Sequence, residues 1–366
     1  MPANAPRPTD TLIGIELGRF SCALAVLFWH YQHFYYLTGD STWFDRTRQP
    51  GYSLLWPFFQ FGYLAVPIFW AFSGFIFFHK YAAPIAAGQV PAARFAMLRF
   101  SRLYPLHFVT LLLAAALQSA YLAQRGAAFV YPSNDLRHFG LQLFLASSWG
   151  LERGSSFNGP VWSISVEVLV YALFFAASRL GATRVWSLVL LAGGAALVSA
   201  TVAKDNQILR CVFFFYLGAL TSVCHRWLDR HLPPRRQIPL LAGAVGVLLA
   251  LFATVPLLQR LPGPMVIAPF VPLAILLLIR LVRPKSQRTA DWIVTLGNTT
   301  YSSYLLHFPI QLAVAVAFAR HPQALPLDNL AVLFAFVAFT IAAGIVCFRR
   351  FERPAQDWIR RRFPTR

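Results

Sequence analysis

Apolar runs of about 20 residues recur along almost the whole of this 366-residue chain, and they restrict it to one kind of fold. A helix needs about 20 apolar residues to cross the ~30 Å hydrocarbon layer of a membrane. Within that layer every backbone N–H and C=O group must find its partner inside the protein, which leaves only helices and closed barrels. Because the runs have helical length, the sequence predicts an all-α polytopic membrane protein that folds as one helical bundle.

About ten membrane-spanning helices are expected. They lie at about 12–34, 55–78, 103–124, 158–178, 185–203, 208–225, 238–257, 266–283, 298–318 and 328–348. Ten spans place both termini on the same side of the membrane. The segment 138–149 is too short to cross and would change this parity, so we expect an interfacial or re-entrant piece on the outer side.

The distribution of basic residues indicates which side carries the termini. The segments on that side contain 22 of the 32 Lys and Arg residues, whereas the opposite loops contain nine. Cytoplasmic loops are enriched in Lys and Arg, so both termini are predicted to be cytoplasmic. The net charge of +19 has the same explanation, and no nucleic-acid partner is expected.

The apolar runs leave no room for a separate soluble domain. We expect one membrane domain over 1–348 and a basic cytoplasmic tail over 349–366. The four cysteines are far apart and form no CxxC pair, so neither a disulfide nor a metal site is favoured.

The first predicted span contains Glu16, Arg19, His30 and His33 among its apolar residues. Because a helix advances ~100° and ~1.5 Å per residue, Arg19 and His30 lie about 20° apart around the axis and about 16 Å apart along it. Glu16 and His33 fall near the same line. A charge that faces lipid costs at least ~2.5 kcal/mol, so this stripe must face protein or water. The alternative is a structural Glu16–Arg19 ion pair with two histidines at the membrane interface.

Glu167 is a second acidic residue within a predicted span, near the outer half of its helix. A carboxylate at that depth could orient or charge-balance a histidine such as His30. That role requires 12–34 and 158–178 to be neighbouring helices. If they are not neighbours, we expect Glu167 to serve acceptor binding or helix packing.

His307 shares a helical face with Thr300 and Ser303. Small hydroxyl residues on a membrane helix indicate either close helix packing or a substrate path. Both interpretations of His307 therefore stay open.

Arg99 and Arg102 lie three positions apart at the start of a predicted helix on the cytoplasmic side. Guanidinium groups bind phosphate bidentately, and the positive end of a helix adds to the attraction. The same pair would also serve as an ordinary positive-inside anchor, which spacing alone favours.

Several of these segments, in this order, resemble the acyltransferase-3 family of integral membrane, acyl-CoA-dependent O-acyltransferases. The matching pieces are "GRFSCALAVLFWH", "FWAFSGFIF", "RFSRLYP", "NGPVWSISVEVLVY", "TTYSSYLLHFPI" and "FERP". Each motif is weak alone, but the six are in register across nearly the whole chain. One departure is Val66-Pro67, where many relatives carry a short acidic signature.

The resemblance implies an enzyme of the inner (cytoplasmic) membrane that takes an acyl group, commonly acetyl, from cytoplasmic acyl-CoA. The acceptor would be a hydroxyl of a glycan, a glycolipid or a small molecule at the cell envelope. Membrane lipid, acyl-CoA and this acceptor are the expected partners, without a metal. Carried over by position, His30 corresponds to the proposed catalytic histidine and Arg19 to its partner, while Arg99 and Arg102 correspond to the pair that holds the CoA end.

Further positions are carried over with less settled roles. Glu167 is a catalytic candidate, and the substrate-binding candidates are His33, Ser73, Trp162 and His307. We expect His30 to act either as the general base for the acceptor hydroxyl or as a nucleophile that carries the acyl group.

Two other classes of protein compete with this interpretation. A proton-coupled transporter or flippase of a cell-envelope saccharide would also place Glu, Arg and His within the membrane. It gives no reason for the paired cytoplasmic arginines. A non-catalytic structural subunit would leave the polar stripe unexplained.

Overall fold

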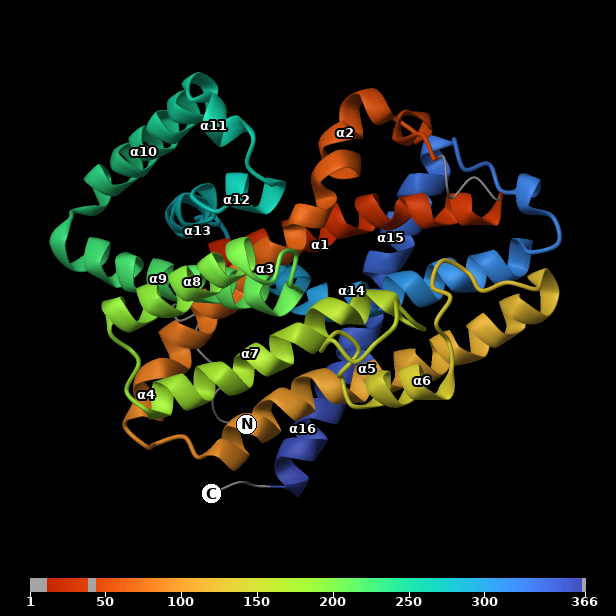
Figure 1. Ribbon diagram of the computed structural model, residues 1–366, viewed down its shortest axis with the longest axis horizontal. Coiled ribbons are helices and arrows are strands. Elements are labelled where there is room, and N and C mark those ends of the chain that lie inside the picture. Colours follow the sequence, from red (N-terminus) through yellow and green to blue (C-terminus); the bar gives the residue numbers. More distant parts are fainter. Residues whose placement is uncertain (1–11, 39–43, 364–366) are drawn as a thin grey trace.

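The computed structural model describes residues 12–38 and 44–363, and within these ranges the regular structure is entirely helical (Figure 1). The α-helices are α1 (Ile13–His30), α2 (Tyr52–Phe61), α3 (Ala65–Phe77), α4 (Ala83–Ala86), α5 (Ala92–Arg125), α6 (Leu136–Leu143), α7 (Trp162–Arg179), α8 (Val185–Thr201), α9 (Gln207–His231), α10 (Pro234–Thr254), α11 (Pro256–Gln259), α12 (Gly263–Ile267), α13 (Phe270–Leu281), α14 (Gln287–Phe318), α15 (Leu330–Cys347) and α16 (Arg353–Arg362). Short 3-10 or π-helical pieces extend several of them, including η2 (Tyr31–Leu37), η5 (Gly62–Leu64), η7 (Gly159–Val161) and η9 (Phe348–Glu352).

The predicted fold class is confirmed. Eight helical segments of the described chain are long and apolar enough to cross a membrane, and α8 and α13 are shorter apolar helices. Together they correspond to the ten predicted runs. The short outer segment contains α6, which has eight residues and is too short to cross.

Three predicted runs differ from the structure, two of them for a common reason. α5 begins at Ala92 and α14 at Gln287, about 11 residues before the predicted spans 103–124 and 298–318. Hydropathy detects only the stretch that matches lipid, whereas these helices continue into polar, charged sequence. The run at 55–78 is two helices, α2 and α3, because the 3-10 turn η5 interrupts it.

α1 lies at the centre of the bundle and packs against α14, α13 and α3, while α3 packs extensively against α9. The last contact is a backbone approach. A Cβ atom on Gly74 would lie 1.8 Å from the carbonyl oxygen of Phe215, and one on Gly218 would lie 1.9 Å from that of Ala71. No side chain fits at either position, so these two glycines allow α3 and α9 to touch.

We expect Gly218→Ala to lower the stability of the protein by about 1–3 kcal/mol or more, because the added methyl group meets a backbone carbonyl that cannot move aside. SDS-induced unfolding of the purified protein measures this. Gly243→Ala is the matched control, since a Cβ there has nothing within 4 Å. Equal unfolding midpoints for the two variants would contradict the close approach.

The C-terminal residues continue α15 through η9 into α16, which packs against α5. Glu352 in η9 is 1% exposed. The N-terminal half of α1 and the helix α16 line one cavity through Glu16 and Gln356, so the two ends of the described chain lie at the same side of the bundle.

Candidate active site

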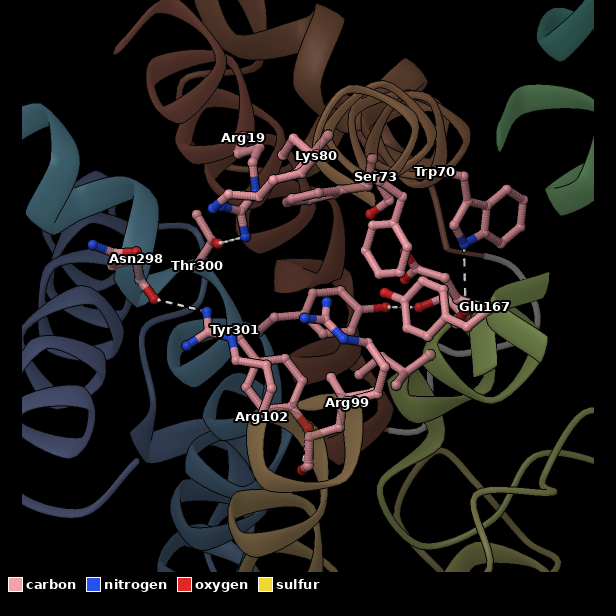
Figure 2. A pocket seen from close by; sticks show the side chains of 18 of the residues that line it. Arg19, Trp70, Ser73, Lys80, Arg99, Arg102, Glu167, Asn298, Thr300 and Tyr301 are labelled. Atoms are coloured by element: carbon pink, nitrogen blue, oxygen red, sulfur yellow. Dashed lines mark hydrogen bonds between the residues drawn. The ribbon is translucent and has the colours of Figure 1, made fainter. Parts of the chain in front are cut away.

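A cavity of about 440 Å³ opens among α1, α3, α5, α7, α14 and α16 (Figure 2). Five basic side chains line it, namely Arg19, Lys80, Arg99, Arg102 and Arg360. Two carboxylates, Glu16 and Glu167, are the acidic lining residues. We call this space the basic cavity. Its lining has a positive balance of charge within a bundle of membrane helices, which suits an anionic ligand.

Arg19 and Glu16 form an ion pair with a distance of 2.9 Å between Arg19 Nη1 and Glu16 Oε2. Arg19 Nη2 also donates to Thr300 Oγ1 of α14, at 3.3 Å. Both residues nevertheless line the basic cavity. The two interpretations of the stripe are therefore compatible, since the ion pair forms and also faces an enclosed space.

Arg99 has no carboxylate partner among the described residues. Its guanidinium carbon lies 4.7 Å from the ring centroid of Phe77 and 5.4 Å from that of Tyr81, and Nη2 donates to the Tyr81 hydroxyl at 3.3 Å. Within the described chain, the buried Nε atom has no hydrogen-bond partner. Aromatic rings thus hold the guanidinium in place while its charge stays available to a ligand.

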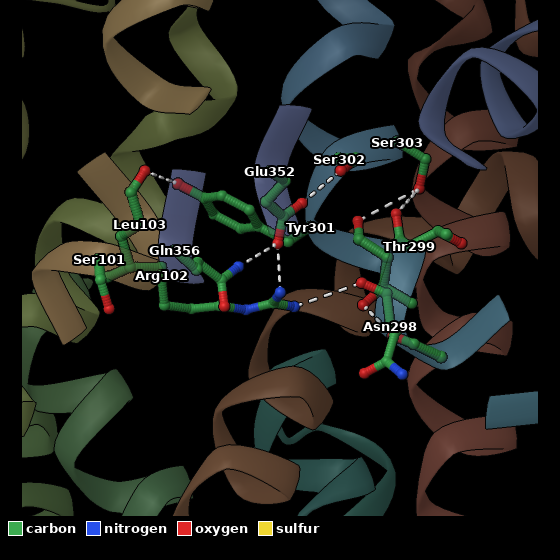
Figure 3. A network of polar contacts seen from close by, with 12 residues as sticks. Ser101, Arg102, Leu103, Asn298, Thr299, Tyr301, Ser302, Ser303, Glu352 and Gln356 are labelled. Atoms are coloured by element: carbon green, nitrogen blue, oxygen red, sulfur yellow. Dashed lines mark hydrogen bonds and ion pairs between the residues drawn. The ribbon is translucent and has the colours of Figure 1, made fainter. Parts of the chain in front are cut away.

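Arg102 differs, because Glu352 of η9 forms an ion pair with it (Figure 3). The Glu352 carboxylate also accepts hydrogen bonds from Ser302 and from Gln356 Nε2, and Arg102 Nη2 donates to the Asn298 carbonyl at 3.3 Å. The charge of Arg102 is therefore largely balanced before any ligand arrives. Glu352 was not predicted as a site residue, although it lies in the "FERP" segment.

Glu167 lies in the basic cavity with Ser73 and Tyr171, which are its hydrogen-bonding neighbours. Its Oε1 atom is buried and has no partner among the described residues. α7, which carries Glu167, packs mainly against α9, whereas the neighbours of His30 come from α14. The helix pairing required for Glu167 to orient His30 is therefore absent from the main contacts of α7.

The three predicted histidines of α1, η2 and α14 form one cluster. The ring centroid of His30 is 4.7 Å from that of His33 and 4.7 Å from that of His307. His33 is 7% exposed, His307 is fully buried, and His30 is half-buried. Gln311, which was not predicted, connects the cluster: its Oε1 lies 3.1 Å from His33 Nδ1, and its Nε2 donates to the His30 carbonyl at 2.7 Å.

The hydrogen bonds fix the tautomer of each ring. His30 Nδ1 lies 3.1 Å from the Val26 carbonyl, and His307 Nδ1 is bonded to the Tyr304 carbonyl. A carbonyl oxygen only accepts, so both Nδ1 atoms carry hydrogen and both Nε2 atoms keep a lone pair. His33 Nδ1 likewise carries hydrogen, because it is bonded to the amide oxygen of Gln311, which can only accept. Once one ring has accepted a proton, its positive charge disfavours protonation of the two neighbouring rings. The cluster is therefore suited to accept one proton.

The histidine cluster adjoins the basic cavity without lining it. Thr300, Tyr301 and Tyr304 of α14 line the cavity, and His307 is the next residue on that side of the helix. The Tyr304 hydroxyl is bonded to Ser163 Oγ of α7 at 2.7 Å. Tyr304 therefore separates the enclosed space from the three imidazoles.

Trp162 lies outside the basic cavity. Its ring packs edge-to-face on Trp70, with the centroids 5.8 Å apart, and Trp70 Nε1 donates to the Ser163 carbonyl at 3.3 Å. Trp70 lines the basic cavity, whereas Trp162 lines a second pocket. In the described parts of the chain, no three His, Cys, Asp or Glu side chains are placed to hold a metal ion.

These features define a polytopic membrane protein with a cation-lined cavity and an adjoining set of bases. The acyltransferase-3 family, described as an acyltransferase domain, matches residues 12–349, and the chain belongs to this family. A curated relative, "Protein 2 in picA locus" of Rhizobium radiobacter, is 34% identical over 127 residues, which are 31% of this chain and 64% of the relative. No solved structure matches the chain.

Proposed function

We propose that this acyltransferase transfers an acyl group, acetyl in the first instance, from cytoplasmic acyl-CoA to a hydroxyl of a cell-envelope glycan or glycolipid. The basic cavity is the observation that carries the proposal. Five cationic side chains around an enclosed space match a donor that carries several phosphates. Arg19 and Arg102 are already paired with carboxylates, but a neutral or cationic substrate would leave Lys80, Arg99 and Arg360 uncompensated inside a membrane protein.

In the proposed complex, Arg99 supplies the least compensated guanidinium, while Lys80 and Arg360 line the same cavity. Arg360 Nε donates to Ser101 Oγ at 3.0 Å, which directs this side chain of α16 towards the start of α5. The uncharged arm of the donor would extend along Tyr301 and Tyr304 of α14. The thioester would thereby approach the histidine cluster.

The chemistry needs one base and one leaving group. As the general base, His30 Nε2 removes the proton of the acceptor hydroxyl while the oxygen of that hydroxyl attacks the thioester carbonyl carbon. The C–S bond then breaks, CoA leaves as the thiolate, and the imidazolium returns the proton to it. In the alternative route His30 Nε2 attacks the thioester carbonyl carbon, the C–S bond breaks, and CoA leaves as the thiolate. The acceptor oxygen then attacks the carbonyl carbon of the acyl-imidazole, the C–N bond breaks, and the hydroxyl proton passes to the thiolate.

We place the enzyme in the inner membrane with both termini in the cytoplasm, as the distribution of basic residues indicates. The proposal includes one membrane domain over 1–348 and a basic segment from 349 onwards. The family match to residue 349 supports this boundary. The position of Gln356 and Arg360 in the basic cavity suggests that α16 also contributes to donor binding.

Arg99→Ala is expected to raise the KM for acetyl-CoA about tenfold or more, because a hydrogen bond to a charged group contributes ~1.5–3 kcal/mol. Thiol release from acetyl-CoA by the protein in nanodiscs, with saccharide acceptors added, measures it. Arg235→Ala on the exposed start of α10 is the matched control. If the wild type neither binds nor cleaves acetyl-CoA, and instead moves a saccharide across vesicles, the transporter interpretation replaces this proposal.

A further inference from the structure

A second pocket, of about 370 Å³, lies beside the N-terminal end of α7. The loop between α6 and η7 provides most of its lining, including Ser147, Ser148, Ser155 and Ser156. We call it the serine-rich pocket. Its volume falls within the ~300–1,000 Å³ range of sites for small ligands. None of the side chains predicted to carry the chemistry lines it, apart from Trp162.

Two buried polar atoms in this pocket have no hydrogen-bond partner among the described residues. They are the Oε1 atom of Gln142, a residue that is 1% exposed, and the Oγ atom of Ser147, which is 9% exposed. An unsatisfied buried polar group costs ~1–3 kcal/mol. Both residues line the pocket. A ligand whose hydroxyl groups reach these two atoms would satisfy them.

The surrounding structure holds these atoms in place. Gln142 Nε2 donates to the Ser156 carbonyl at 2.9 Å, and His107 Nε2 donates to the Gln142 carbonyl at 2.7 Å. At the start of α6, Asp135 accepts from the backbone N–H and the ring of His138, and these hydrogen bonds lower the pKa of the Asp135 carboxyl. The side-chain amide of Gln142 is thus oriented by the loop before η7, and the backbone of Gln142 is tied to α5.

The composition of the pocket indicates the chemical class of its ligand. Serine hydroxyls, two amides, one carboxylate and the indole of Trp162 line it, and the described lining contains no Lys or Arg. Hydroxyl groups of a sugar both donate and accept, which matches hydroxyl and amide partners, while an indole stacks on the apolar face of a sugar ring. An anion such as CoA has no cation to bind there, in contrast to the basic cavity.

The pocket also lies next to the proposed site of reaction. Gly159 and Trp162 line it, and the following residue, Ser163, is bonded to the Tyr304 hydroxyl. Tyr304 in turn accepts a hydrogen bond at its carbonyl from His307. Only a few residues of η7 and α7 therefore separate the serine-rich pocket from the histidine cluster.

We propose that the serine-rich pocket binds an uncharged saccharide as the acyl acceptor, with Gln142, Ser147 and Trp162 as its recognition residues. The role of the bound saccharide as acyl acceptor rests on the proposed acyltransferase function, but binding of the saccharide can be tested by itself. The two substrates would then occupy separate pockets that meet at the Trp70–Trp162 pair.

The test is protection from thiol labelling. Ser155 is exposed at the pocket, so a Ser155→Cys variant, with Cys224 and Cys347 replaced by alanine, reports access to it. Methyl glycosides of glucose, galactose, mannose and rhamnose are added to the reporter variant one at a time. We expect at least one of them to slow maleimide labelling of the introduced thiol several-fold. Lys204→Cys in the exposed α8–α9 loop is the matched control and should show no protection.

Adding Trp162→Leu or Ser147→Ala to the reporter should abolish or weaken the protection, and the unfolding midpoint of each variant shows whether it is folded. Unchanged labelling with every glycoside, or protection that survives in both folded variants, overturns the proposal. Thiol release from acetyl-CoA by the same preparations separates the two hypotheses. Release without protection overturns the saccharide pocket alone, whereas protection without release overturns the acyltransferase function and leaves the pocket standing.

Discussion

Replacing His30 by alanine is expected to lower the rate of acyl transfer by about 10²–10⁴-fold, the usual effect of losing a positioned base. The Val26 carbonyl accepts the hydrogen on His30 Nδ1, which leaves the Nε2 lone pair available. His30 is also the half-buried member of the histidine cluster. CoA-thiol release in the presence of a saccharide acceptor measures the rate. Binding of acetyl-CoA should be unchanged, since no described lining residue of the basic cavity is a histidine.

His231→Ala is the matched control, because His231 is exposed and its ring stacks on Trp227 of the same helix. A His30→Ala enzyme within about twofold of the wild type would reject this residue as base and as nucleophile. The two roles are separated by incubating the wild type with acetyl-CoA and labelled CoA without acceptor. Label appears in acetyl-CoA if an acyl-imidazole forms, and it does not if His30 is only a base.

Replacing Arg102 by alanine is expected to cost about 3–5 kcal/mol of stability, because the buried carboxylate of Glu352 is left unpaired. Glu352 of η9 is 1% exposed and contacts α5, α14 and α16 through Arg102, Ser302 and Gln356. SDS-induced unfolding measures the loss. The double variant Arg102→Met with Glu352→Met should recover most of it, since both charges are then absent.

The exposed pair of Arg210 with Asp205, at 2.9 Å, provides the control. Asp205→Asn should change stability by no more than ~1 kcal/mol. If the double variant is stable and still has the wild-type KM for acetyl-CoA, Arg102 is structural and Arg99 is the principal donor-binding arginine. A raised KM in the stable double variant would assign Arg102 to both tasks.

The helices could be predicted because membrane lipid imposes a local rule on each of them. A segment such as 158–178 must be predominantly apolar along its length, and the structure has a helical span over Gly159–Arg179. Polar extensions obey no such rule, which is why the starts of α5 and α14 were placed late. Helical periodicity is equally local, so the sequence could predict that Arg19 and His30 share one face of α1.

Contacts between side chains on different helices could not be predicted from the sequence. Glu352 lies 250 positions from Arg102, and no spacing along the chain relates the two. Gln311 offered one usable signal, since it follows His307 by four positions and so shares its helical face. The loop that forms the serine-rich pocket has no comparable pattern, because its lining depends on how the segment before η7 folds against α6.

The backbone contact between α3 and α9 has a consequence for motion. With carbonyl oxygens where Cβ atoms would lie, α3 cannot slide or rotate against α9 without a clash. Trp70 is carried by α3 and therefore keeps its position relative to α9. Its partner Trp162 begins α7, so the Trp70–Trp162 contact joins a rigid pair of helices to a third helix.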